Sequence, residues 1–120
     1  MNNKKVACVG SGVIGASWAI CFALKDLDVV VYDINDEVLS KAKTIIHDNL
    51  NILKENNVLD ETRLQEVENH IKLTTSMEEA VRGACFIQES APEHYDVKHQ
   101  VVKEIEKYCL DDAIIASSTS

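Results

Sequence analysis

Glycines cluster near the amino terminus in the segment Gly10-Ser11-Gly12-Val13-Ile14-Gly15, which holds three of the four glycines of the chain. The GxGxxG spacing suits a tight turn, close approach of the backbone to a phosphate, and close packing of a helix on a strand. The free N–H groups and the dipole of a helix start bind a diphosphate without a basic side chain. The motif therefore predicts dinucleotide binding, with contacts from Gly10, Ser11, Gly12, Val13, Ile14 and Gly15.

An acidic residue, Asp33, ends the next apolar run and lies 18 residues beyond Gly15. At that place a carboxylate accepts hydrogen bonds from the adenosine ribose, and its charge opposes the additional phosphate of NADP. No basic residue follows before Lys41, so NAD is the predicted cofactor. Two alternatives stay open: Asp33 could be a turn residue that caps the next segment, and proteins that bind FAD or S-adenosylmethionine share glycine-rich first loops.

Strands and helices must alternate to position these residues. Short apolar or β-branched runs predict strands at 5–9, 28–33, 71–75, 84–88 and 113–116. Helical patterns lie between them at 13–25, from 36 to the break at Asn56-Asn57, at 60–67, after Ser76, and after Pro92. The sequence predicts an α/β fold of Rossmann type: one domain over 1–120, a doubly wound parallel sheet of order 3-2-1-4-5, and a long helical insertion between strands two and three.

Several local features of the helices are also predicted. Asp36 is expected to cap the long helix, and Ser76 with Glu79 to form a capping box before a helix that Gly83 ends. The stripe of the long helix is expected to face the sheet; it consists of Leu39, Ala42, Ile46, Leu50 and Leu53.

Composition restricts the class of protein. The 120 residues are 46% hydrophobic and 27% charged, as in an average globular domain. A formal net charge of −8 disfavours binding to nucleic acid or to anionic membranes. The start of the chain has no signal-peptide pattern, and the four cysteines show no metal-binding spacing, so we expect buried, reduced thiols in a cytoplasmic protein without a metal.

Along its whole length the chain resembles the 3-hydroxyacyl-CoA dehydrogenase family. The match rests on four segments: VACVGSGVIGASWAICF at 6–22, the helical insertion 36–73, FIQESAPEHYDVK at 86–98 and AIIASSTS at 113–120. The second motif, ESAPE at 89–93, is similar to the family's EAxxE loop, and the last segment is similar to its SNTS loop.

The resemblance implies further site residues. Ala91, Glu93 and Lys98 would contact the cofactor, the latter two near its nicotinamide half, and Ser120 would match the active-site serine. Without the family, Glu93 and Lys98 are helix-surface charges. The implied reaction is hydride transfer from a hydroxyl-bearing carbon to NAD, with a histidine–glutamate pair removing the proton. In the family that pair follows the SNTS loop, so the 120 residues alone are expected to bind without turnover.

The histidines of this chain are not expected to take the role of base. They lie on or near predicted helix surfaces, where a solvated side chain is the simpler interpretation, and are His47, His70, His94 and His99. In the family, a helical domain after the SNTS loop closes the cleft and forms the dimer, so a homodimer is expected of the full-length protein.

Some residues depart from the family pattern. Ser118 replaces the SNTS asparagine, and Asp26 must take a left-handed position where many members have glycine. Asn49 and Asn56 stand where CoA-using members have a serine and a lysine. Together with QESAPE, this resembles the branch containing L-carnitine dehydrogenase, lambda-crystallin and L-gulonate 3-dehydrogenase, which implies a free 3-hydroxy acid substrate. A 3-hydroxyacyl-CoA substrate and a non-catalytic or structural module remain the alternatives.

Overall fold

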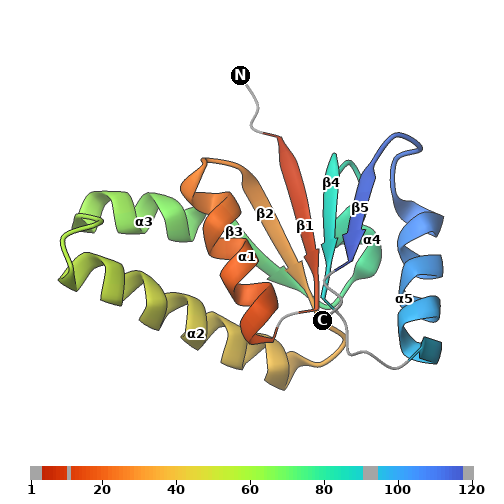
Figure 1. The fold of residues 1–120 in the computed structure, drawn as a ribbon, viewed down its shortest axis with the longest axis horizontal. Coiled ribbons are helices and arrows are strands. Elements are labelled where there is room, and N and C mark those ends of the chain that lie inside the picture. The colour runs from red at the N-terminus through yellow and green to blue at the C-terminus, as the bar shows by residue number, and fades with distance from the viewer. Residues whose placement is uncertain (1–3, 11, 91–94, 118–120) are drawn as a thin grey trace.

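A five-stranded sheet forms the centre of the molecule in the computed structural model, which describes residues 4–10, 12–90 and 95–117, with the backbone alone for 95–98. All neighbouring strands are parallel, in the order β3-β2-β1-β4-β5 (Figure 1). Their bounds are β1 Lys5–Val9, β2 Asp28–Tyr32, β3 Ile71–Thr74, β4 Phe86–Glu89 and β5 Ile114–Ser117. The predicted fold class and strand order are confirmed, and each strand end lies within two residues of its predicted place.

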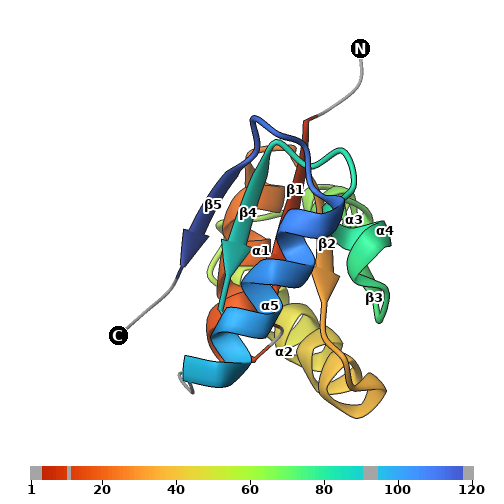
Figure 2. The ribbon, with the colours of Figure 1, turned by 90° about the vertical axis from the view of Figure 1, so that its right-hand side faces the viewer.

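Helices cover both faces of this sheet (Figure 2). Their bounds are α1 Val13–Leu24, α2 Asp36–Glu55, α3 Glu61–Asn69, α4 Met77–Val81 and α5 Tyr95–Tyr108. The predicted start of the last helix at Pro92 lies outside the described residues. Within the described part of the chain, none of the helices has the length and apolar character needed to cross a membrane.

The strands are apolar because they are covered on two sides. One core lies on the side of α1, α2 and α3 and includes Cys8, Val31 and Leu50. The other core lies on the side of α4 and α5 and includes Val9, Ile87 and Ile105. Successive residues of one strand point to opposite cores, as the two-residue period of a strand requires.

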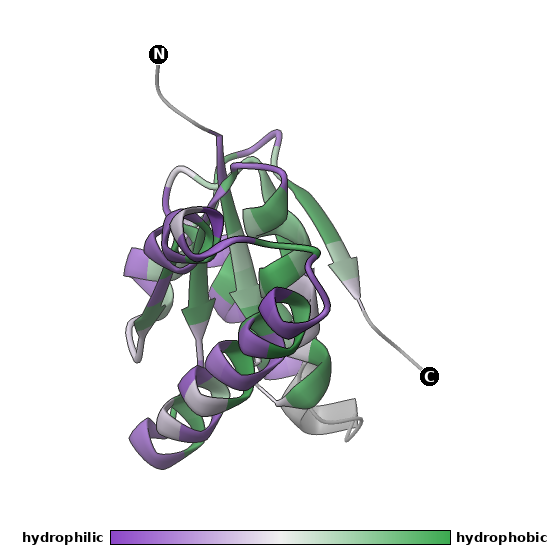
Figure 3. Cartoon of the chain, turned by 90° about the vertical axis from the view of Figure 1, so that its left-hand side faces the viewer, coloured by the Kyte–Doolittle hydropathy of each residue, from purple (hydrophilic) through white to green (hydrophobic). Residues whose placement is uncertain are grey.

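Helix α2 packs differently from its predicted position. Four of the five predicted stripe residues are buried, namely Leu39, Ala42, Ile46 and Leu50. They lie mainly against α1 and α3, with less contact to the edge strand β3, whereas the prediction had the stripe facing the sheet. The reason is that α1 already covers the sheet beside β2, so the insertion forms a layer on α1. In Figure 3 the outer side of α2 is hydrophilic.

The helix ends confirm some capping predictions and correct others. Asn35 caps α2 by accepting from Glu37 N at 2.7 Å, so the prediction of Asp36 as the cap is wrong. Ser76 caps α4 as predicted, but only half of the capping box forms, because Ser76 N donates to Thr74 Oγ1 at 3.0 Å instead of to Glu79. The positive φ angle of Asp26 (63°) confirms its predicted left-handed position. Gly83, which was predicted to end the helix after Ser76, follows the end of α4 with a φ of 78°.

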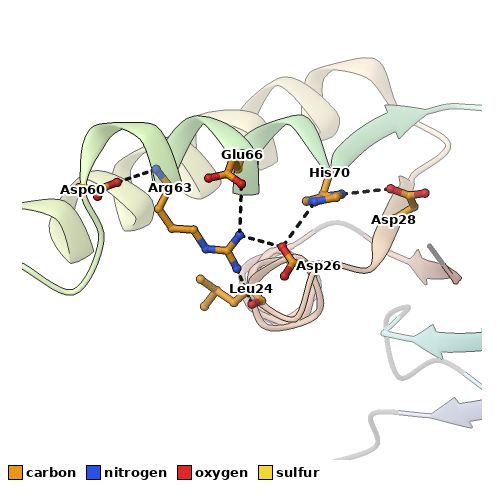
Figure 4. A network of polar contacts seen from close by, with 7 residues as sticks. All are labelled: Leu24, Asp26, Asp28, Asp60, Arg63, Glu66 and His70. Carbon is orange, nitrogen blue, oxygen red and sulfur yellow. Dashed lines mark hydrogen bonds and ion pairs between the residues drawn. The ribbon is translucent and has the colours of Figure 1, made fainter. Parts of the chain in front are cut away.

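A polar network joins the turn before β2 to helix α3 at the amino edge of the sheet (Figure 4). The Arg63 guanidinium donates to Asp26 Oδ1 at 2.7 Å and to the Leu24 carbonyl at 2.8 Å. His70 Nδ1 lies 3.1 Å from Asp28 Oδ1. The hydrogen bond and charge of Arg63 hold the pKa of Asp26 below its usual range. The carbonyl at the end of α1 and both aspartates are thereby partnered.

The four cysteines are free, but their burial is only partly as predicted. Cys8 is buried in β1, and burial raises the pKa of its thiol to about 12. Cys109 is half-buried, while Cys21 and Cys85 are exposed, so the prediction of four buried thiols is wrong. Apolar neighbours in sequence do not bury Cys21, because α1 buries only part of its surface, through Gly15, Ala16, Ala19, Ile20 and Ala23.

Candidate cofactor site

The parallel strands β1, β2 and β4 end at the same edge of the sheet (Figure 1). Gly10 follows β1, and its N–H donates to the carbonyl of Tyr32, the last residue of β2, at 2.8 Å. Ser90 follows β4, and its N–H donates to the Val9 carbonyl at 2.7 Å. Ligands of open α/β sheets bind at this carboxyl edge, where neighbouring crossovers leave in opposite directions. Here that place is β1, between β2 and β4.

Each glycine of the fingerprint meets a different steric demand. Gly10 has a φ of 99°, which L side chains rarely adopt. A Cβ on Gly15 would lie 2.0 Å from the Gly10 carbonyl oxygen, so this position holds α1 close to the loop. A Cβ on Gly12 would meet no atom within 4 Å, so its space is open. The predicted turn, close packing and open approach to a ligand are thus found at Gly10, Gly15 and Gly12, respectively.

The amino terminus of α1 has no side-chain cap, because the residue at its N-cap position is Gly12, which has no side chain. Helices α2, α3 and α4 are instead capped by Asn35, Asp60 and Ser76. Next to the uncapped turn, the side chains of Val13 and Ile14 are 66% and 59% exposed. Free N–H groups at a helix start bind anions. This terminus therefore fits the diphosphate of a dinucleotide.

Asp33 lies one residue past the end of β2 and is half-buried. Its N–H donates to the Thr74 carbonyl at 3.3 Å, and its Oδ1 accepts from Asn35 N at 3.3 Å. The alternative interpretation of Asp33 as a turn residue is therefore supported by its side-chain contact with Asn35 N, although Asn35 and not Asp33 caps α2. Asp36 and Glu37 follow in the first turn of α2 and add negative charge beside Asp33. A carboxylate in this setting favours ribose hydroxyls over a phosphate.

Two polar residues at the end of β4, Glu89 and Ser90, belong to the ESAPE segment but were not among the predicted site residues. Glu89 is completely buried, and its Oε1 accepts a hydrogen bond from Ser117 Oγ at the end of β5. Ser90 Oγ is the buried side-chain oxygen or nitrogen that has no hydrogen-bond partner in the described part of the chain. The available signal for both residues was their place in ESAPE, where the similar EAxxE loop has glutamate at the position of Glu89 and alanine at that of Ser90.

The remaining predicted site residues are only partly placed. Ser11, Ala91, Glu93 and Ser120 lie outside the described residues, as does the side chain of Lys98, whose backbone belongs to α5.

The prediction that the histidine side chains are solvated holds for only some of them. His47 and His99 are exposed, as predicted. His70 is half-buried against Asp28 at the amino edge, which corrects that prediction for this residue. His94 lies outside the described residues. His70 stands at the amino end of β3, so the sheet separates it from the glycine loop.

Comparison with known proteins agrees with this geometry. The L-carnitine dehydrogenase of Oceanobacillus iheyensis is 40% identical over 119 residues, which cover 98% of this chain and 37% of that protein. The lambda-crystallin homolog of Homo sapiens is 35% identical and is covered to 36% of its length. The (S)-3-hydroxybutyryl-CoA dehydrogenase structure from Ralstonia eutropha matches with a TM-score of 0.93 at 30% identity, over 99% of this chain and 42% of that one.

The chain thus spans little more than a third of the length of these curated relatives. The family model of the 3-hydroxyacyl-CoA dehydrogenase NAD-binding domain matches residues 5–120, almost the whole chain. The uncapped helix start, the open position at Gly12 and the acidic end of β2 fit that cofactor. The chain belongs to the 3-hydroxyacyl-CoA dehydrogenase family, as an NAD-binding domain.

Proposed function

We propose that the chain is the NAD-binding part of a dehydrogenase that oxidises the hydroxyl of a free L-3-hydroxy acid, such as L-carnitine, to a keto group. NAD, when bound, supplies the acceptor for the hydride that leaves the carbinol carbon. The observation that favours a free acid is the similarity to L-carnitine dehydrogenases, at 40% identity in two species. The whole enzyme would be a cytoplasmic homodimer with a small-molecule substrate and no nucleic-acid or membrane partner.

In this proposal each half of the cofactor meets a different part of the carboxyl edge. The N–H groups at the start of α1 bind the diphosphate, with Gly10, Ser11, Gly12, Val13, Ile14 and Gly15 as the surrounding loop. Asp33 accepts hydrogen bonds from the adenosine ribose. Ala91, Glu93 and Lys98 contact the nicotinamide half, and Ser120 contacts both substrate and cofactor.

The base that takes the hydroxyl proton belongs, in our proposal, to a segment following residue 120. Of the histidines that the structure describes, His70 is bonded to Asp28 at the opposite edge, and His47 lies against Glu68 of α3. His99 is exposed on α5. The 120-residue chain is therefore expected to bind NAD without oxidising a substrate.

The second candidate substrate is a 3-hydroxyacyl-CoA, favoured by the structural match to (S)-3-hydroxybutyryl-CoA dehydrogenase. One side chain at the C-cap of α2 argues against it. Asn56, which stands where CoA-using members have a lysine, donates its amide to the Ile52 carbonyl at 2.9 Å and so closes its own helix. An amide used in this way offers no cation to the phosphates of CoA.

A binding experiment tests the cofactor assignment. Trp18, the single tryptophan, lies on α1 and is 38% exposed, so its emission reports on ligands at the start of that helix. We expect saturable quenching by NADH and much weaker binding of NADPH. Calorimetry with the same two ligands provides the control, and a folded chain that binds neither would contradict the proposal.

A second titration separates the two substrate classes. With NADH bound, CoA itself is added to the chain and its binding heat is measured. We expect no saturable binding of CoA. Saturable binding that is lost when residues on α2 are changed would favour the acyl-CoA alternative. An enzyme is distinguished from a structural module by a turnover assay of a longer form of the protein. Oxidation of L-carnitine or of a 3-hydroxyacyl-CoA would indicate an enzyme, and no turnover of either would favour the structural module.

A further inference from the structure

The hydroxyl oxygen of Ser90 is buried and has no hydrogen-bond partner among the residues that the structure describes. Glu89, the residue before it, accepts a hydrogen bond from Ser117. A buried hydroxyl left unpaired is unfavourable, because it has given up its bonds to water without replacement. Such a group in a folded protein calls for an explanation, and an absent ligand is one.

The strand register places Ser90 on the side of the cofactor loop. Phe86 contacts Phe22 of α1, with ring centroids 5.7 Å apart, so its side chain is on the α1 face of the sheet. Ser90 lies four residues later, and its N–H still donates to the Val9 carbonyl in the β1–β4 ladder. Because side chains alternate along a strand, Ser90 shares the face of Phe86. It therefore lies beside the loop that runs from Gly10 into α1.

The position along the sheet indicates which half of the cofactor is near Ser90. Asp33 follows β2, on one side of β1, and Ser90 follows β4, on the other side. A dinucleotide whose adenosine lies at Asp33 and whose diphosphate lies at the start of α1 must extend toward β4 with its second nucleotide.

We propose that Ser90 Oγ hydrogen-bonds the nicotinamide-side half of bound NAD, at its ribose or the adjoining phosphate oxygen. The inference rests on the NAD site and adds a cofactor-contacting residue to it. A hydroxyl both donates and accepts, so it suits either group. The family motif EAxxE has alanine at this position, which means that the fold does not need the hydroxyl.

The test compares three ligands on the parent chain and on Ser90→Ala, with two further variants as controls. NADH and ADP-ribose both contain the second ribose, whereas AMP contains only the adenosine half. In Ser90→Ala we expect the Kd values of NADH and ADP-ribose to rise about three- to tenfold, the range of one hydrogen bond, and that of AMP to stay within about twofold. Removing an unpaired hydroxyl should also leave the melting temperature of the ligand-free chain unchanged or raised.

Ser117→Ala is the matched control, since it removes a nearby serine hydroxyl that has a partner in Glu89. We expect it to lower the melting temperature of the ligand-free chain, because it leaves the buried Glu89 carboxylate short of a donor. Ser90→Cys keeps the size of the side chain with a weaker donor and should bind NADH with an affinity between those of the parent and Ser90→Ala.

Three results would overturn the inference. An NADH affinity of Ser90→Ala equal to that of the parent would remove the proposed bond. Equal weakening of AMP and NADH would indicate distortion of the loop, and a fall in the melting temperature would indicate a structural role. Absence of NADH binding in the parent would overturn the NAD site as well, so the two failures are distinguishable.

Discussion

The two edges of the sheet differ in how fully their polar groups are satisfied. At the amino edge, Arg63 bridges Asp26 and the Leu24 carbonyl, and His70 contacts Asp28 (Figure 4). At the carboxyl edge, α1 starts without a side-chain cap, and Ser90 Oγ has no hydrogen-bond partner within residues 4–10, 12–90 and 95–117. The same helix, α1, thus ends in a completed network and begins in an incomplete one.

The difference between the two edges separates the polar groups that stabilise the fold from those that can bind a ligand. Polar groups that protein atoms satisfy stabilise the fold, and polar groups that protein atoms leave open are available to a ligand. The acidic chain needs no basic pocket for an anionic cofactor, because backbone N–H groups provide the donors. The following changes test whether each edge behaves as this division requires.

The largest effect is expected from Gly15→Ala. Alanine usually stabilises a helix interior relative to glycine by about 1 kcal/mol. Here the added Cβ would lie 2.0 Å from the Gly10 carbonyl oxygen, a backbone atom that cannot move without opening the loop. We expect a net loss of about 2 kcal/mol or more in the free energy of unfolding, measured by urea denaturation. Unchanged stability would mean that α1 does not need this close approach.

Gly12→Ala is the matched change at the open position of the same loop. Its Cβ would meet no protein atom within 4 Å, so stability should stay within about 1 kcal/mol of the parent. NADH affinity should fall about tenfold or more, because the methyl group occupies space that the diphosphate needs. If Gly12→Ala bound NADH as tightly as the parent in the Trp18 titration, the open space at Gly12 would not be where the diphosphate binds.

Asp33→Asn sharpens the contrast within the carboxyl edge. The amide oxygen can still accept from Asn35 N, so the turn is retained while the charge is lost. We expect NADH to bind about tenfold more weakly, since a charge-assisted hydrogen bond is lost, and NADPH to bind no worse than before. A parallel loss of both ligands would show that Asp33 acts on the loop and does not select between the cofactors.

The smallest effect is expected at the amino edge, from Arg63→Met. The variant should melt a few degrees lower than the parent at neutral pH with NADH affinity unchanged, because Arg63 serves the fold only. Arg63→Lys, which retains the charge without the planar fork, should lie between them. Weakened NADH binding would contradict the separation of the two edges.

The pH dependence of stability tests the contact between Arg63 and Asp26 further. The folded-state pKa of Asp26 is lowered, mainly by its hydrogen bond from Arg63. Its contribution to stability is therefore complete above the unfolded value, about pH 4, and is lost as the pH falls through the folded value. The difference in melting temperature between the parent and Arg63→Met should therefore become smaller as the pH falls from about 4 through the folded-state pKa of Asp26.

Features that depend on residues close in sequence were predictable. The alternation of strands and helices, the glycine loop and the left-handed turn at Asp26 depend on local residue types. The cap of α2 was assigned to Asp36 instead of Asn35, because neighbouring residues of similar propensity differ only in backbone geometry. Periodicity gave the buried stripe of α2 but not its partner, since a stripe fits a helix as well as a sheet.

Features that join distant segments were not predictable. The bond between Glu89 and Ser117 depends on the register of β4 and β5, and the bond between Arg63 and Asp26 depends on where the insertion returns to the sheet. Neither has a sequence pattern of its own. The Ser90 hydroxyl is notable because it lacks a hydrogen-bond partner among the described residues, and only a three-dimensional structure reveals that.

The two cores on opposite faces of the sheet also bear on local unfolding. Helices α2 and α3 contribute only to the core on the α1 side, and the Arg63 bond is one of their links to α1. If this helical pair opens, the core formed with α4 and α5 keeps all its members. Amide hydrogens of α2 and α3 can therefore exchange with solvent through a partial opening, while those of β1 and β4 exchange only when the whole domain unfolds.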